Sequence, residues 1–105
     1  MIGVDILEIE RMRRPAASPH FMERVFTERE REYLSTRGVQ SAAGLFCAKE
    51  AVSKALGFGL LRVNPHTVEI LHTPSGQPYA EYGGQRIAVS ISHTKTTAVA
   101  VAAIE

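Results

Sequence analysis

The sequence predicts an α+β fold: an N-terminal strand, then helices including one long central helix, then an antiparallel β-meander. Two observations predict it. Helical patterns are confined to the first half of the chain, and strand-like segments joined by short turns follow His66. Short turns connect antiparallel neighbours. Helices segregated ahead of a meander are typical of α+β rather than βαβ folds.

The N-terminal strand is predicted from an alternation with period two. Ile2, Val4 and Ile6 alternate with the residues between them, as strand residues do when one face is buried. Residues 8–14 are predicted to form one or two helical turns that end at Pro15, because proline lacks the backbone N–H that a helix needs.

Two capped helices are predicted next. Ser18-Pro19 places proline at the first position of a short helix. Thr27 and Glu30 form a capping-box pattern at the start of another. This helix is expected to run to about Arg37, where Gly38 could adopt the left-handed conformation that ends many helices.

The longest helix is predicted from about Ser41 to Leu56, ahead of Gly57. At about 100° per residue, its apolar side chains share one arc that faces the core: Leu45, Ala48, Ala51, Val52, Ala55 and Leu56. The opposite arc is expected to hold Phe46, Glu50, Ser53, Lys54 and Gly57.

Four strands with turn-forming residues between them complete the prediction. Their expected ranges are Val68–His72, Pro78–Tyr82, Ile87–Ser92 and Thr97–Ile104. In the third of these strands, Ser90 and Ser92 fall on one face, and His93 and Thr94 enter the following turn.

The composition narrows the class of protein. The 105 residues, of which 45% are hydrophobic and 22% charged, indicate one globular domain spanning residues 1–105. A formal charge of +1 argues against a polybasic nucleic-acid binder, and a single cysteine, Cys47, excludes an internal disulfide. The chain shows no signal peptide and no run of about 18 apolar residues. We therefore expect a cytoplasmic protein that binds neither membrane nor nucleic acid.

Asp5 and the helical pair Glu50 and Lys54 are the first candidates for chemistry. An aspartate within a strand is unfavourable unless its charge is offset, so Asp5 either caps the following helix or has a role at a metal or phosphate. Glu50 and Lys54 have the i,i+4 spacing of a solvated ion pair. They could equally bind a hard cation and a phosphate, provided that Glu50 converges with Asp5.

Arginines near the N-terminus are candidates for partner binding. Arg11, Arg13 and Arg14 form a compact cluster, and Arg24 could lie near it. Arginine suits bidentate recognition of carboxylates on an acidic partner. A solvating face explains the cluster as well. His93, which closes a strand, reads either as a surface residue or as a ligand contact.

The chain as a whole resembles the holo-acyl-carrier-protein synthases, the short class of 4′-phosphopantetheinyl transferases. The matching segments, in order, are Gly3-Val4-Asp5-Ile6 with Glu8 and Arg11, the spacing Phe21…Arg24…Thr27…Glu30, Phe46–Gly57, Gly76-Gln77-Pro78, and Val89-Ser90-Ile91-Ser92-His93. The Lys-Glu-Ala-x-x-Lys-Ala helix combined with an early Gly-x-Asp is specific to these transferases.

This resemblance implies the 4′-phosphopantetheinyl transferase fold and a reaction of fatty-acid or lipid biosynthesis. In that reaction 4′-phosphopantetheine moves from coenzyme A to a serine of apo acyl carrier protein, and adenosine 3′,5′-bisphosphate is released. Asp5 and Glu50 match Mg²⁺ ligands, and Lys54 matches a lysine that contacts coenzyme A. The implied catalytic set is Asp5, Glu50 and Lys54, and the implied coenzyme A contacts are Lys54, Pro78, His93 and Thr94. Arg11, Met12, Phe21 and Arg24 align with positions that dock the carrier protein.

The sequence departs from the family at two positions near the coenzyme A site. Leu45 stands where an arginine is usual, and Gln77 stands where a lysine is common. Arg62 or Lys95 could supply the missing charge. A non-catalytic binder of carrier protein with a degenerate coenzyme A site is therefore an alternative, and a metal-dependent phosphohydrolase is a weaker one.

The resemblance also predicts the assembly. A chain this short has few atoms left to enclose a ligand as large as coenzyme A. The related short synthases are homotrimers with sites at subunit interfaces. We therefore expect Asp5, Glu50 and Lys54 from one protomer, with His93 and Pro78 from its neighbour.

Overall fold

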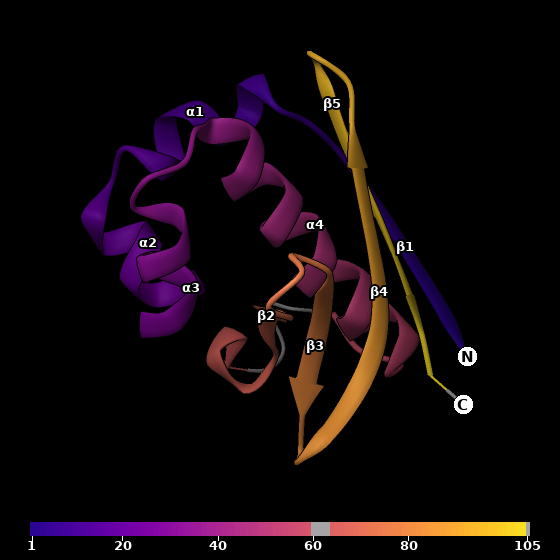
Figure 1. Ribbon diagram of the computed structural model, residues 1–105. Coiled ribbons are helices and arrows are strands. Elements are labelled where there is room, and N and C mark those ends of the chain that lie inside the picture. The colour runs from indigo at the N-terminus through magenta and orange to yellow at the C-terminus, as the bar shows by residue number, and fades with distance from the viewer. Residues whose placement is uncertain (60–63, 105) are drawn as a thin grey trace.

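In the described part of the chain, a strand, four α-helices and four further strands follow one another in the computed structural model (Figure 1). The structure describes residues 1–59 and 64–104. The helices are α1 (Glu10–Ala16), α2 (Pro19–Val25), α3 (Glu28–Leu34) and α4 (Val39–Ala55), with a short 3-10 helix η2 (Pro65–Thr67). The strands are β1 (Ile2–Glu8), β2 (Glu69–His72), β3 (Pro78–Tyr82), β4 (Gln85–His93) and β5 (Thr97–Ala103). The predicted α+β class is confirmed.

The five described strands form one antiparallel sheet in the order β1-β5-β4-β3-β2. β2 to β5 are the predicted meander. β1 pairs with β5 along its whole length, and Asp5 stands opposite Ala100. β1 is therefore an edge strand of the sheet, and it pairs with β5, the last described strand along the chain, as Figure 1 shows.

Helix α4 packs against the sheet on β1, β5 and β4, and α1, α2 and α3 gather beside its N-terminal half (Figure 1). Small residues allow α4 to lie close to the sheet. The residues of β5 that face α4 are Ala98, Ala100 and Ala102, each at most 1% exposed. A Cβ atom on Gly3 would lie 1.9 Å from the Ala51 carbonyl oxygen. Only glycine fits at that contact.

The helix caps follow the predicted chemistry. The Ser18 side chain accepts a hydrogen bond from the Phe21 backbone N–H at 3.3 Å. Thr27 and Glu30 form the complete capping box of α3. Gly57, with φ of 93°, follows α4 in the left-handed conformation.

Two predicted helix ends are wrong. Pro15 lies inside α1, in its last turn. It can do so because proline removes only the bond to the carbonyl four residues earlier, and just Ala16 follows it in the helix. α3 ends at Leu34 instead of Arg37, and Gly38 is extended, with φ of −86°, as the N-cap of α4. The glycine therefore begins a helix where it was expected to end one.

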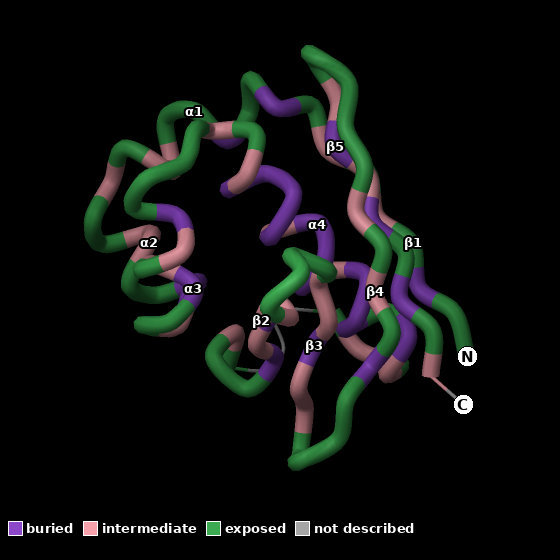
Figure 2. The backbone as a smooth tube through the Cα atoms, viewed as in Figure 1, coloured by how far each residue is buried: buried purple, intermediate pink, exposed green. Residues whose placement is uncertain are grey.

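Most of the predicted core arc of α4 is buried, but so are two polar residues of this helix (Figure 2). Ser53, expected on the exposed arc, is fully buried, and its hydroxyl donates to the Lys49 carbonyl oxygen at 2.9 Å. Lys49 itself is also fully buried. No described helix has the length and apolar character to cross a membrane.

Candidate active site

Asp5 and Lys54 meet where β1 lies alongside the C-terminal half of α4. The Lys54 Nζ atom donates to the Asp5 carboxylate and to the Val4 carbonyl oxygen, each at 3.1 Å. The Lys54 side chain is 52% exposed and the Asp5 side chain 17% exposed. At its open edge, β1 thus presents the Asp5 carboxylate and the Val4 carbonyl oxygen, which strand pairing does not use. Lys54 contacts both of these acceptors.

Glu50 lies one helical turn before Lys54 and is half-buried. Burial, and then the negative charge of Asp5, raise the pKa of Glu50 above its ordinary value, and Lys54 opposes this shift. The Asp5 charge thus acts on the Glu50 carboxylate, and the convergence of the two on a metal stays a prediction.

Cys47 is a buried thiol of α4 that lies within the influence of the Asp5 and Glu50 charges. Burial raises the pKa of its thiol to about 12, and the charges of Asp5 and Glu50 add to the effect. Its Sγ atom lies 3.7 Å from the Ala98 carbonyl oxygen. The thiol is therefore uncharged at neutral pH and is no metal ligand in that state.

The donor set of the site fits Mg²⁺. In the described residues, no cluster of three or more His, Cys, Asp or Glu side chains is arranged to bind a metal ion. Mg²⁺ usually takes one or two carboxylates and fills its remaining positions with phosphate oxygens and water. Asp5 and Glu50 meet that demand, whereas a structural zinc site would require more protein ligands.

His93 and Thr94 lie elsewhere on the sheet, at the end of β4. Leu7 of β1 and His93 both stand opposite Ala98 of β5, so His93 points to the sheet face that carries Asp5. The ring Nδ1 of His93 is hydrogen-bonded to the Thr94 carbonyl oxygen at 2.9 Å. Thr94 accepts backbone hydrogen bonds from Thr96 and Thr97 through its hydroxyl, which shapes the turn. Neither side chain contacts the Asp5–Lys54 pair in this chain.

Pro78 and Lys54 line different cavities. Pro78, at the start of β3, borders a cavity of about 330 Å³ together with Gln77 and residues of β4. Lys54 borders another of about 350 Å³ with Gly57, Phe58 and Gly59. In the part of the chain that the structure describes, Pro78 and Lys54 therefore border two separate cavities.

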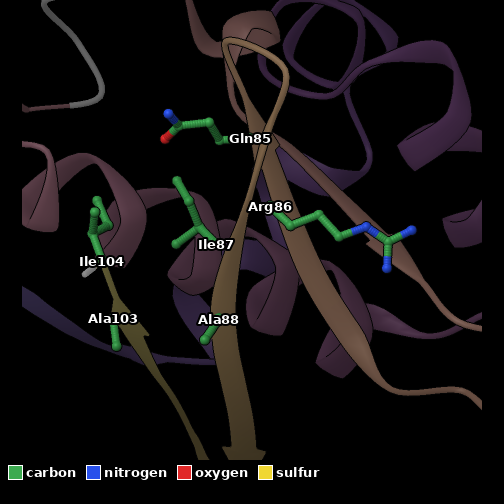
Figure 3. Close-up of a pocket in the computed structure, with 6 residues that line it drawn as sticks. All are labelled: Gln85, Arg86, Ile87, Ala88, Ala103 and Ile104. Atoms are coloured by element: carbon green, nitrogen blue, oxygen red, sulfur yellow. The ribbon is translucent and has the colours of Figure 1, made fainter.

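A further cavity, of about 450 Å³, lies beside the start of β4 and the end of β5 (Figure 3). Figure 3 shows Ile87 and Ile104 beside it, with the Arg86 side chain directed away from Gln85. The guanidinium of Arg86 instead stacks over the Tyr79 ring, 4.0 Å from its centroid. The described residues that border this cavity include no carboxylate.

The residues predicted to dock a partner lie on α1 and α2. Arg11 and Arg24 are exposed, and Phe21 is half-buried with its ring 6.4 Å from that of Phe26. Met12 is only 3% exposed and belongs to the hydrophobic core. Met12 therefore supports this surface from beneath.

The two departures from the family pattern have different environments. Leu45 is 2% exposed and packs in the core, while Gln77 is exposed in the turn before β3. Lys95 is exposed beside Thr94. Arg62, the other expected substitute, lies outside the described residues.

Sequence reasoning missed a buried ion pair next to the site. Lys49 Nζ donates to the Glu30 carboxylate at 2.6 Å, and both side chains are fully buried. The signal was present on the helical wheel: Lys49 lies one turn after Leu45 and one turn before Val52, on the core-facing arc.

Comparisons with known proteins agree with these features. The chain matches the family model of the 4′-phosphopantetheinyl transferase superfamily over residues 1–104. It is 41% identical to a holo-[acyl-carrier-protein] synthase of Caldanaerobacter subterraneus subsp. tengcongensis, covering 96% of this chain and 91% of that one. It is 40% identical to a synthase of the same name from Clostridium botulinum, with 99% and 95% covered.

Solved structures give the same result. A holo-(acyl-carrier-protein) synthase from Bacillus anthracis, in complex with CoA (3′,5′-ADP), superposes with a TM-score of 0.85 at 36% identity, over 96% of this chain and 91% of that one. The holo-[acyl-carrier-protein] synthase of Helicobacter pylori, in complex with coenzyme A, superposes with a TM-score of 0.87 at 29% identity, over 100% of both chains. This chain therefore belongs to the 4′-phosphopantetheinyl transferase superfamily and is an enzyme of its holo-[acyl-carrier-protein] synthase group.

Proposed function

We propose that this enzyme transfers 4′-phosphopantetheine from coenzyme A to a serine of apo acyl carrier protein in the cytoplasm, that the transfer depends on Mg²⁺, and that adenosine 3′,5′-bisphosphate is the other product. The observation that carries the proposal is the meeting of Asp5, Glu50 and Lys54 at the open edge of β1. The coenzyme A complexes of the similar synthases support the choice of donor.

Asp5 and Glu50 are the residues that would hold Mg²⁺ in this proposal. When bound, the ion supplies positive charge that neutralises phosphate oxygens. Lys54, which is half-exposed, would turn its ammonium group from Asp5 to a phosphate of coenzyme A. Phosphoryl transfer depends on such positioning and charge neutralisation more than on covalent participation by the protein.

The transfer itself forms one bond and breaks one. The serine hydroxyl oxygen attacks the phosphorus that bears pantetheine, and the pyrophosphate bond breaks, leaving adenosine 3′,5′-bisphosphate. The hydroxyl proton must leave in this step. The raised pKa of Glu50 suits this residue as the acceptor, and a water molecule held near Asp5 is the other candidate.

Carrier-protein docking is proposed at Arg11, Phe21 and Arg24. Exposed guanidinium groups can bind carboxylates of an acidic partner in bidentate fashion, and Phe21 adds apolar surface between them. Met12 holds α1 in place from the core side.

We also propose that the enzyme is a homotrimer with active sites at its subunit interfaces. The large apolar side chains exposed in the described part of the chain are Met1, Ile2, Val4, Ile6 and Val101. Val4 stands opposite Val101 in the sheet, so Ile2, Val4, Ile6 and Val101 form one outward face of β1 and β5. Contiguous exposed apolar surface is typical of a protein–protein interface. A neighbouring protomer could then bring its His93 and Pro78 to the site of Lys54.

The decisive test is mass spectrometry of apo acyl carrier protein incubated with the enzyme, coenzyme A and Mg²⁺. The expected result is a gain equal to the mass of phosphopantetheine, which chelation of the metal prevents. If several carrier proteins show no gain while the enzyme is folded, the proposal fails.

The buried Leu45 and the neutral Gln77 favour one alternative, a carrier-protein binder with a degenerate coenzyme A site. Calorimetry separates it from the enzyme. The alternative requires binding of carrier protein without binding of coenzyme A.

A further inference from the structure

The buried pair Glu30–Lys49 joins three elements of the fold. One carboxylate oxygen of Glu30 accepts the backbone N–H of Thr27 at 2.8 Å and the Lys49 ammonium at 2.6 Å. The other accepts the backbone N–H of Ile70 at 2.8 Å. The carboxylate is thus fixed to the start of α3 and to β2, and Lys49 attaches α4 to it.

Stability alone does not account for this pair. Both side chains are fully removed from water, and desolvation of the two charges offsets much of their attraction. Lys49 is covered by the Phe26 ring, whose centroid lies 5.7 Å from Nζ. Proteins in which a buried ion pair is replaced by apolar side chains of similar size are often as stable as the original. The pair does give α4 a single fixed rotational setting.

Lys49 directly precedes Glu50, so the two side chains leave α4 about 100° apart. On the β1 side, α4 meets Gly3 at the Ala51 carbonyl oxygen. The helix is thereby held on two sides, by a backbone contact at Gly3 and by an ion pair at Glu30. A rotation of about 10° would carry a side-chain atom about 1 Å around the helix.

We propose that Lys49 and Glu30 are positioning residues that set the rotation of α4 and so place the Glu50 carboxylate against Asp5. The inference rests on the proposed function for its catalytic consequence, but the placement of Glu50 is a property of the apoprotein. Metal affinity and turnover respond to such supporting residues, since a misplacement of about 1 Å can cost about 100-fold in rate.

The test uses Lys49→Met, which removes the cation, and Lys49→Gln, which also removes the cation and whose amide nitrogen ends one bond short of the lysine ammonium that Glu30 accepts. Lys49→Arg, which keeps charge and donor, is the rescue variant. The matched control is Arg29→Met, because Arg29 of α3 forms a neighbouring ion pair with Glu69 of β2 at 2.7 Å but is 63% exposed. Circular dichroism establishes which variants are folded.

Three measurements are made on the folded variants. Free Mn²⁺, counted by electron paramagnetic resonance, gives metal affinity, and the transfer assay gives kcat and the KM for carrier protein. Crystal structures without metal give the Asp5–Glu50 separation. We expect metal affinity and kcat to fall by about 10- to 100-fold in Lys49→Met or Lys49→Gln. The KM for carrier protein should stay constant, Lys49→Arg should recover part of the loss, and Arg29→Met should match wild type.

Unchanged metal affinity and an unchanged Glu50 position in a folded Lys49→Met or Lys49→Gln variant would overturn the inference. If Lys49→Met does not fold, Lys49→Gln decides. A wild type that transfers nothing defeats the proposed function instead, and the crystal structures still report whether Lys49 positions Glu50.

Discussion

The surroundings of Glu50 disfavour the charged form of its carboxylate. Burial and the nearby Asp5 carboxylate both favour its protonated form, and the Lys54 cation compensates in part. An electrostatic cost of ionisation of this kind is typical of groups at functional sites. A cation bound at Glu50 would reduce that cost. The effect of Glu50 on folding should therefore be opposite to its effect on catalysis.

We predict that Glu50→Gln abolishes transfer yet makes the metal-free protein more stable than wild type at pH 7. The folded-state pKa of Glu50 is raised, so the favourable protonated state is lost as the pH rises through that value. The advantage of the variant should thus shrink toward acid pH, below the unfolded pKa, where Glu50 is protonated in both states. Urea unfolding across this pH range measures it.

Glu10→Gln is the control for this experiment, because Glu10 is an exposed partner of Arg13 at 3.0 Å and such pairs contribute little. A Glu50→Gln protein less stable than wild type at pH 7, in chelator, would contradict the assignment.

At the scale of elements, the site depends on how closely β1 approaches α4. A Cβ atom at position 3 would also lie 2.6 Å from the Ala55 backbone nitrogen, and backbone atoms cannot yield as a flexible side chain can. Asp5 lies two residues further along the same face of β1. Any increase in the separation of β1 and α4 at Gly3 would therefore also displace the Asp5 carboxylate.

Gly3→Ala is expected to lower the free energy of unfolding by about 3 kcal/mol or more, at the upper end of overpacking effects. It should lower transfer activity as well. Chemical denaturation gives the first quantity. Gly59→Ala is the stability control, because a Cβ at Gly59 meets no atom of the described residues within 4 Å. Equal losses in the two variants would rule out the close approach as the cause.

Patterns among neighbouring residues predict many of the helix starts and turns. The capping box at Thr27 and the short turns of the meander depend on neighbouring residues, so the sequence shows them directly. The start of α4 at Gly38 and the burial of Lys49 depend on what lies across the fold. Periodicity could mark Lys49 as core-facing, but its partner Glu30 comes from a separate helix. No local pattern identifies that partner.

At the scale of the whole molecule, the proposed homotrimer depends on the outward face of β1 and β5. Motif resemblance, rather than any local pattern, led to the homotrimer prediction. The pairing of β1 with β5 was not evident from the sequence either, because it joins the two ends of the chain. That pairing is what brings Val4 and Val101 together as one apolar surface.

We predict that Ile6→Glu yields folded monomers with strongly reduced transfer. Ile6 is 69% exposed, so a charge there should not disturb the fold of one chain, but it would be desolvated at an interface. Light scattering coupled to size exclusion measures the assembly. Gln40→Glu, at an exposed position of α4, should remain a trimer, and a wild type that is monomeric and fully active would disprove the interface.

The pairing of β1 with β5 also has a consequence for how the protein is made. Asp5 and Glu50 are both synthesised before β5, yet Asp5 lies on a strand that only β5 holds in the sheet. Contacts between residues so distant in sequence form slowly, and synthesis proceeds at about 5–20 residues per second. On the ribosome, the helices can form early, whereas the apolar side chains of β1 stay unpaired until the last strand emerges. We expect the nascent chain to be inactive and prone to aggregation until that moment.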